Sequence, residues 1–139
     1  MINNSANLKR FLPLEDLIVK NASMKPLNSS VQIFIDTGCS VIFGPPTIMS
    51  PIIDLFPKTL DCNNSNVYPN ITFVIQGDDY QITPAEYVLK LSENECVLGI
   101  QAVNSPELEN MILMGDPFFK AFYAHMDFGK KRIGLAKAQ

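Results

Sequence analysis

The chain of 139 residues has little of several features, and each shortage excludes a class of protein. It has a single histidine, His125, so we expect neither a Ser-His-Asp triad nor a histidine-based metal site. No apolar run reaches the ~18 residues of a membrane-spanning helix. The formal net charge is only −3, which gives no reason to expect nucleic acid or a membrane as a partner. We expect no bound metal and no cofactor.

The N-terminal segment also lacks the features of a signal peptide. Residues Met1 to Arg10 are polar and rich in asparagine, without the apolar centre of a signal peptide. We expect residues 1–9 to form a flexible lead and residues 10–139 to form one domain. A chain of this length, with 47% apolar residues, is large enough to bury a core.

Short apolar runs separated by turn residues predict a mostly β domain from Phe11 onward. Three short helices interrupt the predicted strands. The first spans 47–56, with Thr47 as a possible N-cap, and the second is a single turn, Pro84–Tyr87. The third begins at Asp116, which would cap it ahead of a proline at the first helical position.

The tripeptide Asp36-Thr37-Gly38 lies between two apolar runs, Ile33–Ile35 and Val41–Phe43. Apolar flanks bury the approach to the turn, and glycine lets the backbone come close to the acid. The pattern predicts one carboxylate, Asp36, held rigidly at the floor of a cleft. The alternative is an ordinary turn aspartate at the end of a strand.

A second segment, Met111–Phe119, reads MILMGDPFF. Together with Asp36-Thr37-Gly38, it resembles the C-terminal lobe of the pepsin-like aspartic peptidases, where an apolar-apolar-Gly-Asp segment opens a helix. The resemblance covers about Arg10 to Lys137. It implies a pepsin-like lobe of closed, barrel-like sheets with short helices. The first lobe, with its own Asp-Thr-Gly and its flap, is missing from this sequence, so we expect a fragment, a partial gene product or a processed piece.

The resemblance implies an aspartic endopeptidase, in which two carboxylates hold a water molecule against a peptide bond. One carboxylate acts as the base and the other as the acid, because sharing a proton separates their pKa values. Asp36 would be one of the pair. The other would come from an N-terminal lobe or from a second copy of this chain in a two-fold dimer. A polypeptide substrate would lie extended between the lobes.

Supporting roles follow from the same resemblance. The Thr37 hydroxyl would bond to the backbone of the other lobe, and the Gly38 amide would approach the carboxylate. Gly115 would permit close packing beside the catalytic loop. Ser40 corresponds to a position near the acid, although an ordinary turn serine is an equally simple reading.

Three residues are assigned to the substrate cleft: Phe34, Cys39 and Leu113. Core packing is the alternative for Phe34 and Leu113. Cys39 departs from the family, which usually has serine or threonine there, and a thiol is a poor hydrogen-bond donor beside a carboxylate. Asp116 is interpreted as structural and not as the second catalytic acid.

The three cysteines leave one unpaired thiol if a disulfide forms. By the resemblance, Cys62 and Cys96 are bonded and Cys39 is free; the alternative is three free thiols in a cytosolic protein. A disulfide indicates a secretory route, ending outside the cell or in an acidic lysosome-like or vacuole-like compartment. Five Asn-X-Ser/Thr triplets permit glycosylation on that route, and they begin at Asn3, Asn21, Asn28, Asn63 and Asn70.

A second functional class competes with the peptidase. The chain could be a non-catalytic pepsin-like lobe, kept for binding or left as a decayed remnant. Cys39 and the missing first lobe favour this alternative, whereas the intact Asp36-Thr37-Gly38 disfavours it.

Overall fold

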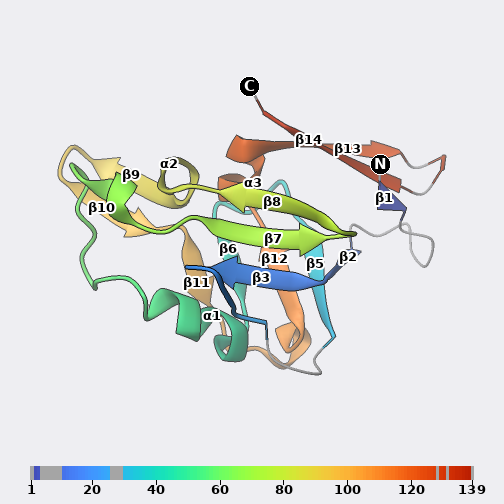
Figure 1. Cartoon of the computed structure of the whole chain (residues 1–139), viewed down its shortest axis with the longest axis horizontal. Coiled ribbons are helices and arrows are strands. Elements are labelled where there is room, and N and C mark those ends of the chain that lie inside the picture. The colour runs from blue at the N-terminus through green and yellow to red at the C-terminus, as the bar shows by residue number, and fades with distance from the viewer. Residues whose placement is uncertain (1, 4–10, 26–29, 128, 131, 139) are drawn as a thin grey trace.

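The structure is a computed structural model that describes residues 2–3, 11–25, 30–127, 129–130 and 132–138 (Figure 1). Strands dominate it and the helices are short, so the prediction of a mostly β lobe is confirmed. The described strands form four sheets, of five, four, three and two strands. None of these four sheets closes on itself, so the expected barrel-like closure is not seen in the described part of the chain.

The two strands that precede Asp36 and Gly115, β5 and β12, are neighbours within the five-stranded sheet. Its order is β11-β6-β12-β5-β2. Strand β12 runs parallel to β5 and lies between β5 and β6, which are consecutive in the chain. The bounds are β2 Phe11–Leu14, β5 Val31–Ile35, β6 Ile42–Gly44, β11 Ile100–Ala102 and β12 Met111–Met114.

The other sheets are antiparallel. The four-stranded sheet has the order β4-β3-β7-β8, with β3 Asp16–Val19, β4 Ala22–Ser23, β7 Ile71–Ile75 and β8 Asp78–Ile82. A hairpin pairs β9 Val88–Ser92 with β10 Glu95–Leu98. The last sheet joins β1 Ile2–Asn3, β13 Phe122–Asp127 and β14 Arg132–Lys137. Strand β1 falls within the expected flexible lead of residues 1–9, whereas residues 1 and 4–9 of that lead lie outside the described residues.

The helices are α1 Pro46–Ile53, α2 Pro84–Tyr87 and α3 Asp116–Ala121, with 3₁₀ turns at η1 Ser65–Val67 and η2 Pro106–Leu108. The predicted N-caps are wrong in two cases. Pro45 precedes α1 and Gly115 precedes α3, so Thr47 and Asp116 are already helical. Asp116 still lies in the first turn of α3, where a negative charge suits the helix dipole. No helix of the described residues is long and apolar enough to span a membrane.

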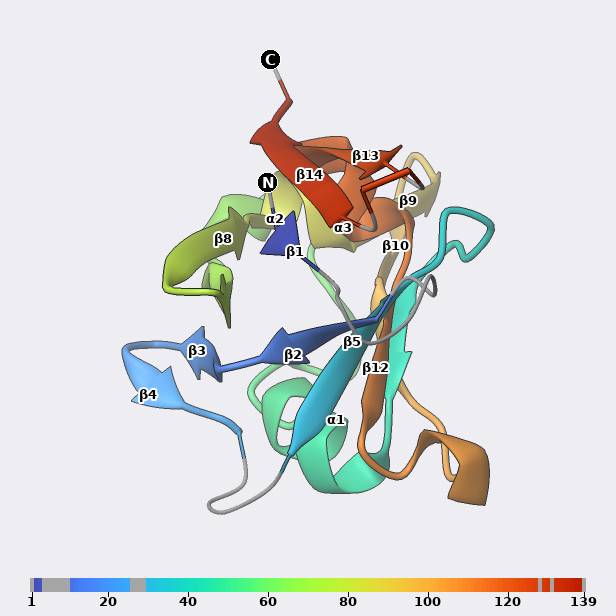
Figure 2. The same cartoon turned by 90° about the vertical axis from the view of Figure 1, so that its right-hand side faces the viewer.

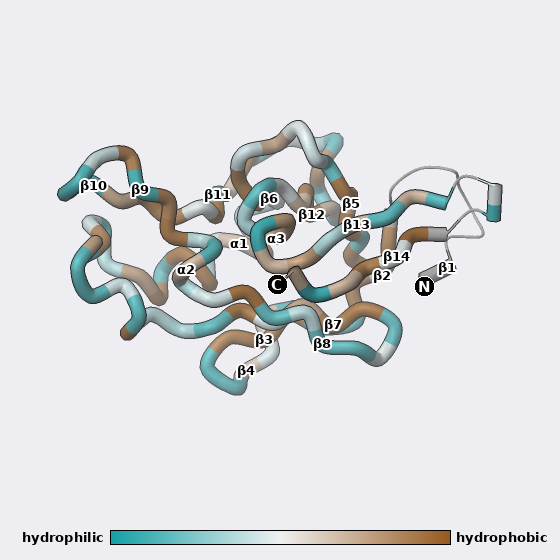
Figure 3. Tube along the Cα trace, turned by 90° about the horizontal axis from the view of Figure 1, so that it is seen from above, coloured by the Kyte–Doolittle hydropathy of each residue, from teal (hydrophilic) through white to brown (hydrophobic). Residues whose placement is uncertain are grey.

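One core lies between the five-stranded and four-stranded sheets and α3. Phe118 of α3 is fully buried and meets Phe73 of β7 edge-on, with ring centroids 6.2 Å apart. Tyr87 of α2 is fully buried too, and its hydroxyl donates a hydrogen bond to the carbonyl of Pro69 at 2.5 Å. Polar residues gather in the turns that join the strands, as at the β7–β8 turn (Figure 3). This core fixes the sheet that presents Asp36.

Candidate active site

Residues 36–41 form a loop that joins β5 to β6 and passes over the end of β12. Two backbone hydrogen bonds connect this loop to the last residue of β12 and to the segment that follows it. The Asp36 amide donates to the Met114 carbonyl at 3.1 Å, and the Asp116 amide donates to the Cys39 carbonyl at 2.8 Å. In Figure 2 the loop projects to the right of the strand labelled β5. The loop that carries the aspartate is therefore anchored by main-chain hydrogen bonds at two points, Asp36 and Cys39.

Gly115 lies directly beneath the loop. A β-carbon added to Gly115 would come within 2.2 Å of the Val41 carbonyl oxygen and 2.4 Å of the Cys39 carbonyl oxygen. Real β-carbons do not approach backbone atoms so closely, so only glycine fits unless the loop moves. The close packing expected at this position is present in the structure.

The Asp36 carboxylate is oriented by the loop itself. The Gly38 amide donates to Asp36 Oδ1 at 3.0 Å. Asp36 is half-buried, whereas Thr37, Gly38 and Ser40 are exposed. A carboxylate held at the base of an open, exposed loop is available to a water molecule or to a second group that approaches from outside.

Cys39 is the free cysteine, and it is half-buried. Its thiol donates to the Val41 carbonyl at 3.2 Å, a weak sulfur hydrogen bond within the loop. The Cys39 side chain thus braces the backbone of its own loop.

Phe34 and Leu113 lie side by side on one face of the five-stranded sheet. The strand register pairs Leu113 with Phe34 on one side and with Phe43 on the other. All three side chains are half-buried, whereas their neighbours on the opposite face, such as Ile33 and Ile112, are fully buried. The row of Phe34, Leu113 and Phe43 therefore belongs to the less buried face of the sheet.

Residues 7–138 match the family model of the eukaryotic aspartyl proteases. The chain belongs to the eukaryotic aspartyl protease family. The resemblance inferred from the two sequence segments is therefore confirmed, and the match covers nearly the whole of this aspartyl protease chain.

Similarity to several curated proteins supports the same family assignment. The chain is 28% identical to cathepsin D of Dictyostelium discoideum over 136 residues, which is 90% of this chain and 35% of that protein. It is 29% identical to pepsin A of Rhinolophus ferrumequinum over 130 residues, 87% of this chain and 33% of that protein. Renin of Echis ocellatus is 37% identical over 111 residues, 73% of this chain and 28% of that protein. The chain thus spans about a third of the length of the curated relatives it matches.

The disulfide predicted for this aspartyl protease chain is present. Cys62 and Cys96 are bonded, with Cα atoms 5.6 Å apart and a sequence separation of 34. The bond attaches the long loop before β7 to strand β10. The predicted disulfide, with Cys39 as the free thiol, is therefore confirmed.

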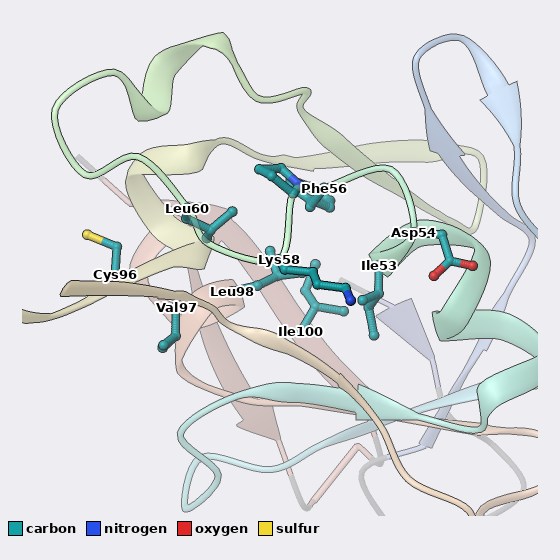
Figure 4. Close-up of a pocket in the computed structure, with 10 residues that line it drawn as sticks. Ile53, Asp54, Phe56, Lys58, Leu60, Cys96, Val97, Leu98 and Ile100 are labelled. Atoms are coloured by element: carbon teal, nitrogen blue, oxygen red, sulfur yellow. The ribbon is translucent and has the colours of Figure 1, made fainter.

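A separate hollow of about 430 Å³ lies next to this disulfide (Figure 4). Apolar side chains from the end of α1, the following loop and β10–β11 line it: Ile53, Phe56, Leu60, Leu98 and Ile100. No residue of the 36–41 loop lines it. It is a second feature of the surface and not part of the Asp36 site.

The described part of the chain contains no candidate metal-binding site. No group of three His, Cys, Asp or Glu side chains lies close enough there to hold a metal ion.

Two features of the structure, one at the Asp36 loop and one at α2, were not predicted from the sequence. The first is the backbone contact between Asp116 and Cys39, since main-chain hydrogen bonds between distant segments leave no residue-type signal. The second is a capping box at α2, where the Thr83 amide donates to Glu86 Oε1 at 2.9 Å. The Thr-X-X-Glu spacing before Tyr87 is a readable signal for it.

Proposed function

We propose that this chain is one lobe of an aspartic endopeptidase and that Asp36 is one of its two catalytic carboxylates. The observation that supports this most directly is the Asp36 carboxylate itself. It accepts a hydrogen bond from the Gly38 amide in a loop that β12 and Gly115 hold from below. Such pre-organisation is what a carboxylate needs to position water for attack on a peptide carbonyl.

The reaction needs a second carboxylate. One ionised aspartate accepts a proton from water, but it cannot also protonate the carbonyl oxygen in the same step. In the proposal the second group comes from another pepsin-like lobe, either an N-terminal lobe or a second copy of this chain. The two acids then share one proton, so that one acts as the base and the other as the acid. A polypeptide substrate binds in the cleft between the two lobes.

Neighbouring residues take supporting roles. Thr37 is exposed at the turn, where its hydroxyl is free to reach the facing lobe. Ser40 is exposed near the acid on the same loop. Phe34 and Leu113, on the less buried sheet face, and Cys39 contribute surface to the substrate cleft in this proposal.

The compartment proposed for the protein is oxidising. The Cys62–Cys96 bond favours the secretory route, because cytosolic reductants remove most disulfides. One relative, from Arthroderma otae, is named vacuolar protease A, and the chain is 33% identical to it over 111 residues. We propose an extracellular location or an acidic vacuole-like or lysosome-like compartment.

The competing function is a non-catalytic lobe that only binds polypeptides. The observation in its favour is Cys39, whose thiol bonds to Val41 in a loop where the family usually has a hydroxyl. A peptidase assay on unfolded globin at acidic pH separates the two functions. The peptidase proposal expects no cleavage by isolated monomers and cleavage by an assembly in which two lobes face each other. A binding lobe gives no cleavage in either state.

A further inference from the structure

Three asparagines that begin Asn-X-Ser/Thr triplets lie exposed on the described surface: Asn21, Asn63 and Asn70. None of these triplets has proline in the middle position, so each is an acceptor sequence for N-linked glycans. The triplets that begin at Asn3 and Asn28 include residues outside the described part of the chain.

Asn21 lies at the tip of a hairpin. Val19 pairs with Ala22, so Lys20 and Asn21 form the two-residue turn between β3 and β4. Both turn residues have positive φ angles, 53° and 63°, as a type I′ turn requires. A group attached to Asn21 leaves from the end of the hairpin and does not interrupt the pairing of the strands.

Asn70 lies at the same end of that sheet. Val19 pairs with Ile71, so the turn that carries Asn21 is next to the residue that precedes β7. Asn21 and Asn70 line one shallow hollow of about 210 Å³, together with the polar side chains of Lys20 and Gln81. Amide and ammonium groups at such a hollow are partners for sugar hydroxyls.

Asn63 lies in the loop that the disulfide attaches, next to Cys62. Between Asn63 and Asn70 is Val67, an apolar side chain that is 65% exposed. Hydrophilic oligosaccharides on both sides would screen Val67 from other protein surfaces. No triplet asparagine of this group lies in the 36–41 loop, and the β3–β4 hairpin projects on the opposite side of the molecule from that loop (Figure 2).

We propose that Asn21, Asn63 and Asn70 are N-glycosylated. The side-chain amide nitrogen forms a bond to the anomeric carbon of an oligosaccharide, supplied by a polyprenyl diphosphate donor. The bond from that carbon to the diphosphate breaks, the diphosphate leaves with the bonding electrons, and the nitrogen loses one proton. The proposal rests on the oxidising compartment proposed above, which the disulfide favours and where such donors act. The proposal does not depend on the catalytic role of Asp36.

The proposal is tested by mapping the glycosylated asparagines of the secreted protein by mass spectrometry. The full chain is expressed behind a secretion leader in a glycosylating eukaryotic cell, and its glycans are removed with a peptide-N-glycosidase, which converts each glycosylated asparagine to aspartate. We expect aspartate at positions 21, 63 and 70 in the peptide masses. Asn21→Gln, Asn63→Gln and Asn70→Gln should each remove one glycan from the intact mass. Asn66→Gln, an exposed asparagine outside any triplet in the same loop, is the matched control and should remove none.

Mapping on the unmutated chain keeps the test valid if a variant is not secreted. Unmodified asparagine in all three peptides of the secreted, disulfide-bonded protein would overturn the proposal. An unmodified asparagine at one position would overturn it for that position.

Discussion

Among single residues, Gly115 has the strongest influence on the position of the 36–41 loop. Gly115→Ala would force a β-carbon against the Val41 and Cys39 carbonyls, so the loop must shift. We expect a loss of about 3 kcal/mol of unfolding free energy, as for overpacked sites. Urea unfolding followed by circular dichroism measures it.

Gly38→Ala is the matched control for Gly115→Ala. A β-carbon at position 38 would meet only Asp36 Oδ1, at an ordinary 3.5 Å. We expect its stability to change by less than about 1 kcal/mol. If the two variants unfold at the same urea concentration, the packing beneath the loop is not as tight as the structure has it.

A second residue-scale prediction concerns alkaline pH. Burial, and secondarily the nearby Tyr68, raises the pKa of Tyr87 above its ordinary value. The folded state therefore keeps this proton where the unfolded chain, with a pKa of about 10, loses it. The stabilising contribution is complete below pH 10 and falls as the pH rises further, by up to about 1.4 kcal/mol per pH unit.

Tyr87→Phe tests this pH dependence. At neutral pH it should cost about 1 kcal/mol, because the hydrogen bond to the Pro69 carbonyl is lost. Above pH 10 its stability should fall less steeply than that of the parent. Both proteins should carry Cys39→Ala, so that no free thiolate exchanges with the disulfide. Equal slopes would show that Tyr87 does not cause the alkaline loss.

At the element scale, the disulfide connects the loop before β7 to strand β10. The double variant Cys62→Ala/Cys96→Ala should lose on the order of 3–4 kcal/mol, because the bond closes a loop of 34 positions in the unfolded chain. Cys39→Ala is the control and should change stability by about 1 kcal/mol or less. Mass spectrometry of non-reduced digests should find the Cys62 and Cys96 peptides joined. A linkage through Cys39 would contradict the structure.

Elements with a strong local pattern were predictable from the sequence. The alternation of Ile71, Phe73 and Ile75 predicts β7, and Pro84–Tyr87 is one helical turn as expected. By its sequence alone, the segment from Cys96 to Val103 reads as one continuous strand, but Gly99 divides it into β10 and β11. A β-carbon at Gly99 would lie 2.7 Å from the Tyr87 carbonyl, a tertiary contact that no local pattern reveals.

The candidate site also contains residues that local sequence pattern reveals and contacts that it does not reveal. Asp36 and Gly38 were recognisable because the tripeptide and its apolar flanks are contiguous in the chain. The position of β12 between β5 and β6, and hence the role of Gly115, depends on pairing between segments about eighty residues apart. Helix caps at α1 and α3 were misplaced, since each cap depends on where the preceding strand ends and not on the residue type alone.

At the scale of the whole molecule, the open sheet edges predict self-association. Strand β13 pairs only with β14 among the described strands, and its Tyr123 is 65% exposed. An unpaired edge with an exposed aromatic side chain favours pairing with another chain. We expect dimers or larger species at micromolar concentration in sedimentation velocity. Tyr123→Lys should shift them towards monomers, and a parent that stays monomeric would remove this argument.

The central claim is that Asp36 is one carboxylate of a pair formed between two lobes. The decisive measurement is cleavage of unfolded globin at acidic pH by a purified two-lobe assembly, with sedimentation recorded on the same sample. Asp36→Asn keeps the shape of the side chain but removes the shared proton, so it should abolish cleavage and leave the assembly intact. Asp116→Asn, at an exposed acid in the first turn of α3, is the matched control and should retain activity. An assembly that cleaves globin equally well with and without Asp36→Asn would contradict the proposed catalytic role of Asp36.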